Sequence, residues 1–307
     1  MHTPEPPPRP DPFAAPVPQT LPVLTESPAL AGHLTLNIAR GHTHGPPLLL
    51  LHGVTRCWRD WAAVLPELTP HWQVTAPDHR GHGSSERSPT ASYRIVDYAA
   101  DAGLLLAQMG DQPVVLFGHS LGAMVAAVVA ARAPGRIRAL VLEDPPGSVL
   151  AEGVRQSPFF LQFSGIQRLL TRPWTAPELA AALAELPVHH PGNGSIVKFG
   201  QLRDPAALRF SAECLIQMDP HVLDPLLAGR WLEGLDWFAE LPHIDCPTLL
   251  LRADPACGGM LSAAEADRAA ALIPRCQRLD LPGIGHNIHS TQPRRTLEIV
   301  NQFLASL

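Results

Sequence analysis

The distribution of apolar residues along the 307-residue chain predicts buried strands that alternate with helices. Residues 47–51 and 113–117 form continuous apolar runs, Pro-Leu-Leu-Leu-Leu and Pro-Val-Val-Leu-Phe. Because a strand covered on both faces has no polar side, such runs are typical of the middle of a parallel sheet. Strands are predicted at about 33–39, 47–52, 73–76, 113–118, 138–143, 247–252 and 277–281. Helical patterns lie between them, so we expect the α/β class, with a mostly parallel central sheet and helices on both faces.

The pattern changes between Pro145 and about Leu241, where helical segments follow one another without convincing strands. Residues 246–251, Cys-Pro-Thr-Leu-Leu-Leu, then resume the sheet. We therefore expect a helical cap at 146–240, inserted into a core formed by 29–145 and 241–307. Residues 1–28 contain ten prolines and offer little apolar surface to bury, which predicts a flexible leader.

Composition and charge exclude several classes of function. An apolar content of 46% and a formal charge of −5 fit a soluble globular protein. The 23 Lys and Arg residues are scattered, with Lys198 as the only lysine, so no nucleic-acid partner is expected. No segment approaches the ~20 apolar residues of a membrane span, and residues 1–28 lack the basic start and apolar stretch of a signal peptide. Nothing in the sequence indicates an oligomeric state.

The cysteines and histidines suggest neither a disulfide framework nor a metal site. The five cysteines are odd in number and lack paired spacing, which favours a reducing, cytoplasmic location. Among the fifteen histidines, those at 33, 42, 44, 189 and 190 form no helical i, i+4 pair with a nearby Glu and have no Cys partner. We expect no metal and no cofactor.

Residues 118–122, Gly-His-Ser-Leu-Gly, carry the strongest chemical signal. They follow an apolar strand and precede a run of small apolar residues that predicts a helix. This order of strand, tight turn and helix is that of a nucleophile elbow, in which glycines allow strand and helix to approach and the serine hydroxyl projects above the sheet. Ser120 is therefore the predicted nucleophile.

A serine nucleophile needs a base, and acyl transfer needs amide donors for the developing oxyanion. His286 follows the last predicted strand in the stretch Pro-Gly-Ile-Gly-His, and its two preceding glycines suit a loop that presents the imidazole. We prefer it to His289, three residues later. The backbone N–H groups of Val54, after an earlier central strand, and Leu121, after the serine, are the predicted oxyanion donors.

These segments resemble the α/β-hydrolase superfamily, in its capped branch of esterases, lactonases, epoxide hydrolases and haloalkane dehalogenases. The resemblance covers most of residues 29–307 and rests on Leu-His-Gly at 51–53, Asp-His-Arg-Gly-His-Gly-Ser-Ser at 78–85, the serine motif and Gly-Ile-Gly-His at 283–286. It implies a structural role for Asp78, Arg80 and His82. Dehalogenases and epoxide hydrolases of this branch attack with an aspartate, so a serine at position 120 argues against both.

The resemblance leaves two candidates for the acid that orients His286. The usual position follows the strand at 247–252, where Asp254 is two residues early and the expected position is Ala256. Some dehalogenases and lactonases place the acid after the preceding strand instead, and alignment with them selects Asp144. We favour Asp144 and keep Asp254 as the alternative.

The sequence thus predicts a carboxylesterase-like or lactonase-like serine hydrolase. Its expected substrate is a small molecule with an apolar acyl or lactone group, cleaved through an acyl-enzyme on Ser120. Two alternatives have the same fold and triad: a ligand receptor without turnover, and a cofactor-free lyase or perhydrolase.

Overall fold

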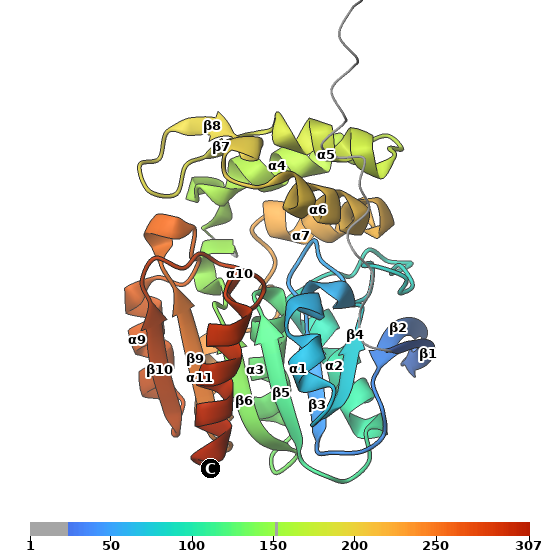
Figure 1. Ribbon diagram of the computed structural model, residues 1–307, viewed down its shortest axis with the longest axis vertical. Helices are drawn as coiled ribbons and strands as arrows, with labels where there is room; N and C mark the ends of the chain where they lie inside the picture. Colours follow the sequence, from blue (N-terminus) through green and yellow to red (C-terminus); the bar gives the residue numbers. More distant parts are fainter. Residues whose placement is uncertain (1–23, 151–152) are drawn as a thin grey trace, which may run out of the picture.

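The computed structural model describes residues 24–150 and 153–307, which contain one eight-stranded sheet flanked by helices (Figure 1). The strand order is β1-β2-β4-β3-β5-β6-β9-β10. Strand β2 is antiparallel to both of its neighbours, β1 and β4, and the six strands from β4 to β10 are parallel to one another. The strands are β1 Thr25–Ala31, β2 Leu34–Arg40, β3 Pro47–Leu51, β4 Gln73–Pro77, β5 Val114–His119, β6 Ile137–Glu143, β9 Thr248–Ala253 and β10 Cys276–Leu281. All seven predicted strands are present, each within one residue of its predicted ends, which confirms the fold class.

Two hydrophobic cores lie on the two faces of the sheet. Successive side chains of a strand point to opposite faces, so Val114 and Leu116 of β5 join one core while Val115 and Phe117 join the other. Helices α2 (Ile95–Gln108) and α3 (Leu121–Arg132) contribute to the first core, and α1 (Leu65–Leu68) and α11 (Pro293–Ala305) to the second. The continuous apolar runs are therefore explained by burial on both faces.

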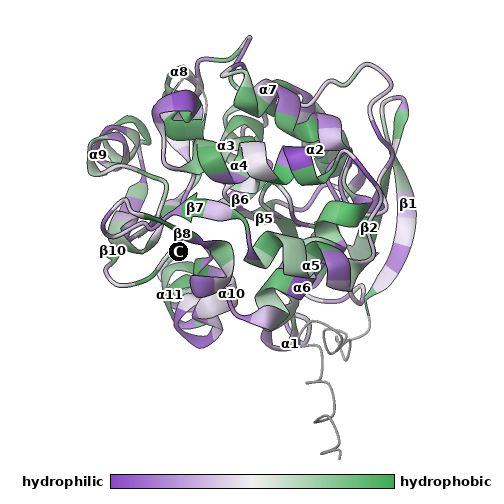
Figure 2. Ribbon diagram, turned by 90° about the horizontal axis from the view of Figure 1, so that it is seen from above, coloured by the Kyte–Doolittle hydropathy of each residue, from purple (hydrophilic) through white to green (hydrophobic). Residues whose placement is uncertain are grey.

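Most of the elements between β6 and β9, from α4 to α7, lie over the carboxyl ends of the parallel strands (Figure 1). In the view from above, α4 to α7 spread across this end of the sheet, and α5 and α6 carry both hydrophobic and hydrophilic residues, as expected for helices with one buried side (Figure 2). The remaining helices are α4 Phe159–Leu169, α5 Ala176–Ala184, α6 Pro205–Gln217, α7 Leu223–Leu227, α8 Trp237–Glu240, α9 Ala263–Leu272 and α10 Ile288–Thr291. Short 3-10 helices occur at η1 Trp58–Ala63, η2 Gly147–Leu150, η3 Val154–Gln156, η4 Phe199–Gln201, η5 Pro220–Val222, η6 Leu241–His243 and η7 Pro255–Cys257.

Two sequence predictions need correction. Residues 25–28, assigned to the leader, belong to the edge strand β1, where Pro28 is tolerated because one side of an edge strand has no partner. The segment expected to be purely helical also contains a hairpin, β7 (Pro187–His189) paired with β8 (Ile196–Lys198). Its three-residue strands are too short to give a periodic pattern. The rest of the predicted leader, residues 1–23, lies outside the described residues.

Within the described residues, no helix combines the length and apolar character that crossing a membrane requires.

The turn from β5 into α3 brings three backbone segments into close contact. A Cβ atom at Gly122 would lie 1.9 Å from the carbonyl oxygen of Leu51 in β3, and one at Gly118 would lie 2.2 Å from the carbonyl oxygen of Gly122. Both distances are far below van der Waals contact, and backbone atoms cannot rotate away as a side chain can. Only glycine allows this packing at the two positions.

We predict that Gly122→Ala destabilises the protein severely, by about 3 kcal/mol or more, because β3 and α3 must separate. Gly103→Ala is the matched control, since Gly103 lies inside α2 and a Cβ there would meet no atom within 4 Å. Thermal unfolding should show Gly103→Ala unchanged or stabilised by up to about 1 kcal/mol. Equal stability of the two variants would contradict this packing.

Candidate active site

Ser120 lies between β5 and α3 with φ 53° and ψ −116°, a conformation that non-glycine residues rarely adopt. Its N–H donates to the carbonyl of Glu143 (2.9 Å), and its own carbonyl accepts from the N–H of Ala123 (3.0 Å) at the start of α3. The residue is 2% exposed and lines a cavity of about 870 Å³ that His286 also lines. The predicted nucleophile and base thus face the same space.

His286 follows β10 and contacts the carboxylate of Asp144, with 2.6 Å between Nδ1 and Oδ2. A carboxylate only accepts hydrogen bonds, so Nδ1 carries the proton and Nε2 is left as an acceptor. Asp144 is fully buried directly after β6, and it also accepts from the backbone N–H groups of Met260 (2.8 Å) and Ala253 (3.1 Å). These bonds hold the carboxylate in one orientation.

The alternative acid, Asp254, is directed elsewhere. Its two carboxylate oxygens accept from the backbone N–H groups of Ala256 (2.9 Å) and Gly283 (2.8 Å), which organises the loops after β9 and β10. These hydrogen bonds lower the pKa of Asp254. The structure brings Asp144, rather than Asp254, to the imidazole of His286.

Burial lowers the pKa of His286 below its ordinary value of 6.5, and this effect outweighs the contact with Asp144, which raises it. The imidazole is therefore neutral near pH 7 and can accept a proton through Nε2. This is the state that a general base requires.

The loop after β3 holds the Val54 amide in a defined direction. The backbone N–H of His79 donates to Nε2 of His52 (3.0 Å), so the other ring nitrogen of His52 carries the proton and donates to the carbonyl of Gly53 (2.8 Å). In a planar trans peptide the next N–H points away from this carbonyl, so the N–H of Val54 is directed away from His52. Val54 lines the cavity beside Ser120. The Leu121 amide lies in the first turn of α3, where helical N–H groups have no partner within the helix.

Backbone strain is concentrated around the cavity. Four non-glycine residues in the described ranges have positive φ, and three of them are Thr55 (66°), Ser120 (53°) and Asp144 (43°). Each such residue costs on the order of 1–3 kcal/mol and persists where the surrounding structure enforces it. Strain of this kind is typical of functional sites.

The family model for the alpha/beta hydrolase fold matches residues 46–293. The chain belongs to the alpha/beta hydrolase fold family. It is 26% identical over 280 residues to a 2-(acetamidomethylene)succinate hydrolase of Mesorhizobium japonicum, covering 89% of this chain and 92% of that protein. It is also 26% identical over 282 residues to an sn-1-specific diacylglycerol lipase of Mus musculus, covering 89% and 85%.

Solved structures of other proteins share the fold. An E-2-(acetamidomethylene)succinate hydrolase superimposes with a TM-score of 0.70 at 22% identity, covering 92% of this chain and 100% of the other. An enol-lactonase from Burkholderia xenovorans gives a TM-score of 0.68 at 20% identity, covering 91% and 100%. At these identities the comparison establishes the fold alone.

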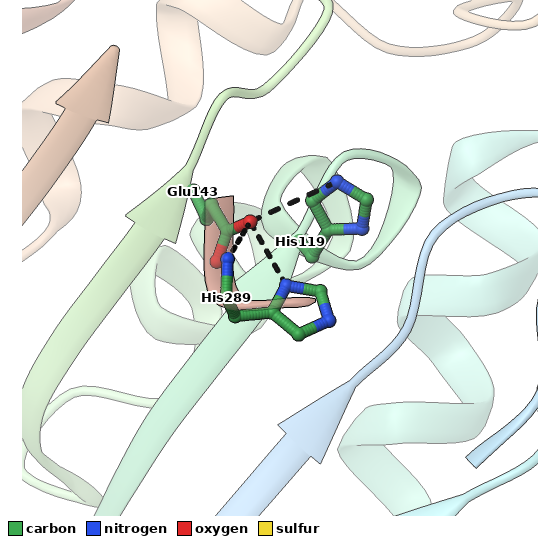
Figure 3. Close-up of side chains that lie close together, drawn as sticks. All are labelled: His119, Glu143 and His289. Atoms are coloured by element: carbon green, nitrogen blue, oxygen red, sulfur yellow. Dashed lines mark hydrogen bonds and ion pairs between the residues drawn. The ribbon is translucent and has the colours of Figure 1, made fainter. Parts of the chain in front are cut away.

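In this alpha/beta hydrolase a second group of ionisable side chains is buried next to Ser120 and His286, formed by Asp60, His119, Glu143 and His289. Figure 3 shows the last three. Glu143 Oε1 accepts from the backbone N–H groups of Ile288 (2.9 Å) and His289 (3.1 Å) and lies 2.9 Å from Nδ1 of His289. His119 Nε2 lies 3.2 Å from the carbonyl oxygen of His286. We call these four side chains the buried ionic network.

The surroundings of His289 favour its protonated form. Nδ1 faces Glu143, and Nε2 lies 3.2 Å from the carbonyl oxygen of Asp60, so both nitrogens meet acceptors. Burial alone would lower the pKa of His289, but the charges of Glu143 and Asp60 and their hydrogen bonds raise it above its ordinary value. His289 is absent from the cavity wall, whereas His286 lines it.

We did not identify the buried ionic network from the sequence, although His119 and Glu143 directly precede Ser120 and Asp144. Each of His119, Glu143 and His289 offers one atom that could bind a metal ion. These atoms lie within 4.8 Å of one another, and these residue types can bind zinc. Oxygen Oε1 of Glu143 is already surrounded by three N–H groups. Hydrogen bonding therefore accounts for the arrangement of Glu143 and His289.

We predict that Glu143→Gln destabilises the protein by about 3 kcal/mol, because it leaves the buried His289 cation without its nearest counter-charge. His289 lowers the pKa of Glu143 in spite of burial, so the carboxylate stabilises the fold fully above its ordinary value of 4.5 and loses this effect as the pH falls through the lowered pKa. The pKa of His289 is raised, so the protonated imidazole stabilises the fold fully below pH 6.5, and this stabilisation is lost as the pH rises through the raised pKa. The loss in Glu143→Gln should be largest between pH 4.5 and 6.5.

Urea unfolding at several pH values measures this difference. Glu185→Gln is the control, because Glu185 pairs with Lys198 at the surface, where both side chains are more than half exposed. The control should lose less than about 1 kcal/mol at any pH. A similar loss of unfolding free energy in both variants would show that the charge of Glu143 does not stabilise the buried ionic network.

Proposed function

We propose that this chain is a serine hydrolase that cleaves a carboxylic ester, a lactone or a related acyl bond. Ser120 is the nucleophile, His286 the general base and acid, and Asp144 the orienting acid. The observation that carries the proposal is the 2.6 Å contact between His286 Nδ1 and Asp144 Oδ2, at the cavity that Ser120 and His286 share. The hydrolase names of the relatives support the reaction class.

In the proposed mechanism, Nε2 of His286 takes the proton of Ser120 as the hydroxyl oxygen attacks the substrate carbonyl. Asp144 holds the imidazole in the required tautomer and stabilises the imidazolium. The N–H groups of Val54 and Leu121 donate to the oxyanion that develops during attack. His286 then protonates the leaving group, and water releases the acyl group from Ser120 by the same steps.

The substrate in this proposal is a small molecule with an apolar acyl or lactone part. Residues 146–240 act as the cap that closes the site, and Phe159, Phe163 and Phe199 from this segment line the cavity. Apolar side chains around a few polar groups are typical of small-molecule sites. The enol-lactonase with the same fold is consistent with a lactone as one substrate type.

A panel of 4-nitrophenyl esters and lactones tests the reaction class. We expect turnover by the full chain and its loss by a factor of roughly 10⁴ or more in Ser120→Ala, since removal of the nucleophile leaves only binding and oxyanion stabilisation. Turnover that survives unchanged in Ser120→Ala, or none with any ester or lactone, would contradict the proposal.

Replacing each candidate acid by asparagine tests which of the two orients His286. Asp144→Asn should lower kcat by about 10⁴, because an amide cannot hold the imidazole in the productive tautomer or stabilise the imidazolium. Asp254→Asn should retain kcat within about tenfold, since Asp254 contacts loop amides rather than the imidazole. Steady-state kinetics on one ester separate the two, and the reverse order of effects would identify Asp254 as the acid.

A further inference from the structure

The cavity above Ser120 is lined by charged side chains that the proposed mechanism does not use: Arg56, Arg203, Arg252 and Glu265. Two of them are satisfied by neighbours. Arg252 forms an ion pair with Asp280 (2.9 Å) and donates to the carbonyl of Leu261 (3.0 Å). Glu265 accepts from the backbone N–H of Ser148 (2.8 Å) and the hydroxyl of Ser262 (2.8 Å). The other two, Arg56 and Arg203, form no such close ion pair with any described residue.

Arg56 follows the Val54 amide by two residues. Its Nη1 donates to the hydroxyl of Ser211 (2.8 Å), and its Nε lies 3.6 Å from Asp60 Oδ1. Asp60 also lies 3.7 Å from the ring of His289 in the buried ionic network. The Asp60 carboxylate therefore lies near both Arg56 and His289, and it neutralises the charge of Arg56 only in part.

Among the described residues, no carboxylate lies within ion-pair distance of Arg203, and the charges of Asp204 and Asp60 act on it only from farther away. Its Nη2 donates to Oδ1 of Asn287 (3.3 Å), the residue directly after His286, and its guanidinium lies 5.9 Å from the ring centre of Phe199. The neighbouring carboxylate of Asp204 caps α6 by accepting from the N–H of Ala207 (2.8 Å). Arg203 is thus a cation in the wall of the cavity that forms no ion pair within the described part of the chain.

Its surroundings oppose the charge. Burial lowers the pKa of Arg203 and the charge of Arg56 lowers it further, and the opposing charges of Asp204 and Asp60 offset this only in part. Two like charges that line one cavity repel each other, and an anion bound there would offset this repulsion. An anion in this cavity would lie near both arginines, because both residues line it.

We propose that Arg203, with Arg56 beside it, binds a carboxylate group of the substrate. This inference rests on the proposed function and deepens it: the acyl or lactone substrate carries a carboxylate in addition to the bond that is cleaved. A guanidinium matches a carboxylate with two parallel N–H donors. A single cation without an ion-pair partner suits a singly charged carboxylate better than a doubly charged phosphate. The hydrogen bond to Asn287 holds the guanidinium next to the loop of His286.

Two esters of equal chain length test the proposal: the 4-nitrophenyl monoester of glutaric acid, which carries a carboxylate, and 4-nitrophenyl pentanoate, which does not. We expect the full chain to prefer the monoester in kcat/KM after subtraction of uncatalysed hydrolysis. Arg203→Gln should lower kcat/KM for the monoester by roughly 30-fold or more and leave that for the pentanoate within about threefold. Arg203→Lys, which keeps the charge, should recover part of the preference.

Arg168→Gln is the matched control, since Arg168 is an exposed arginine of α4 that does not line the cavity. It should leave the ratio of the two kcat/KM values unchanged. Thermal unfolding of all variants shows whether Arg203→Gln still folds. If it does not fold, the ratio of the two kcat/KM values is compared instead between the parent chain, Arg203→Lys and Arg56→Gln. Hydrolysis of both esters with equal kcat/KM, or a ratio unaffected by Arg203→Gln, would overturn the carboxylate site.

A binding measurement separates failure of this inference from failure of the proposed function. Calorimetric titration of the Ser120→Ala protein with monomethyl glutarate and with dimethyl glutarate requires no turnover. Tighter binding of the monomethyl ester, removed by Arg203→Gln, supports the carboxylate site even if no ester is hydrolysed. Equal affinity for the two esters, or binding of neither, would overturn it while ester hydrolysis by the parent chain still supported the serine hydrolase.

Discussion

The candidate site depends on the close approach of β3, β5 and α3 at Ser120. Gly118 and Gly122 occupy positions where any Cβ atom would overlap a backbone oxygen, so the three segments are held at a separation that only glycine allows. The chain can pass from strand to helix in this space only with Ser120 at positive φ. The hydroxyl is thereby held at the cavity that His286 also lines. The packing of the sheet thus sets the position of the chemistry.

Asp60 lies close to the buried histidines His119 and His289 and also to Arg56 of the cavity wall. Its carboxylate lies 3.6 Å from His119 and 3.7 Å from His289, and 3.6 Å from Arg56, which lines the cavity. Because charges interact strongly where water is excluded, a change in any of these groups affects the others. The proposed substrate carboxylate would supply a negative charge on the cavity side, where Asp60 balances Arg56 only in part.

The sequence predicted what depends on local pattern. Apolar runs such as 113–117 located the central strands because burial on both faces leaves a continuous signal, and the serine motif stood out because its glycines are required by sterics. The orienting acid could not be decided this way, since Asp144 and Asp254 follow adjacent parallel strands and only side-chain direction separates them. The residues of the buried ionic network are distant from one another in the sequence, and so are Arg203 and Asn287. Their contacts form only when the chain folds, and no local pattern predicts them.

The central claim is that the Ser120 hydroxyl is activated by the neutral imidazole of His286. Reaction of the full chain with a fluorophosphonate, followed by intact-mass measurement and peptide mapping, tests it most directly because the reagent bonds covalently to an activated serine. We predict one adduct per chain, on the peptide that contains Ser120, with labelling abolished in His286→Ala. An adduct on another residue, or labelling of Ser120 at the same rate without His286, would contradict the claim.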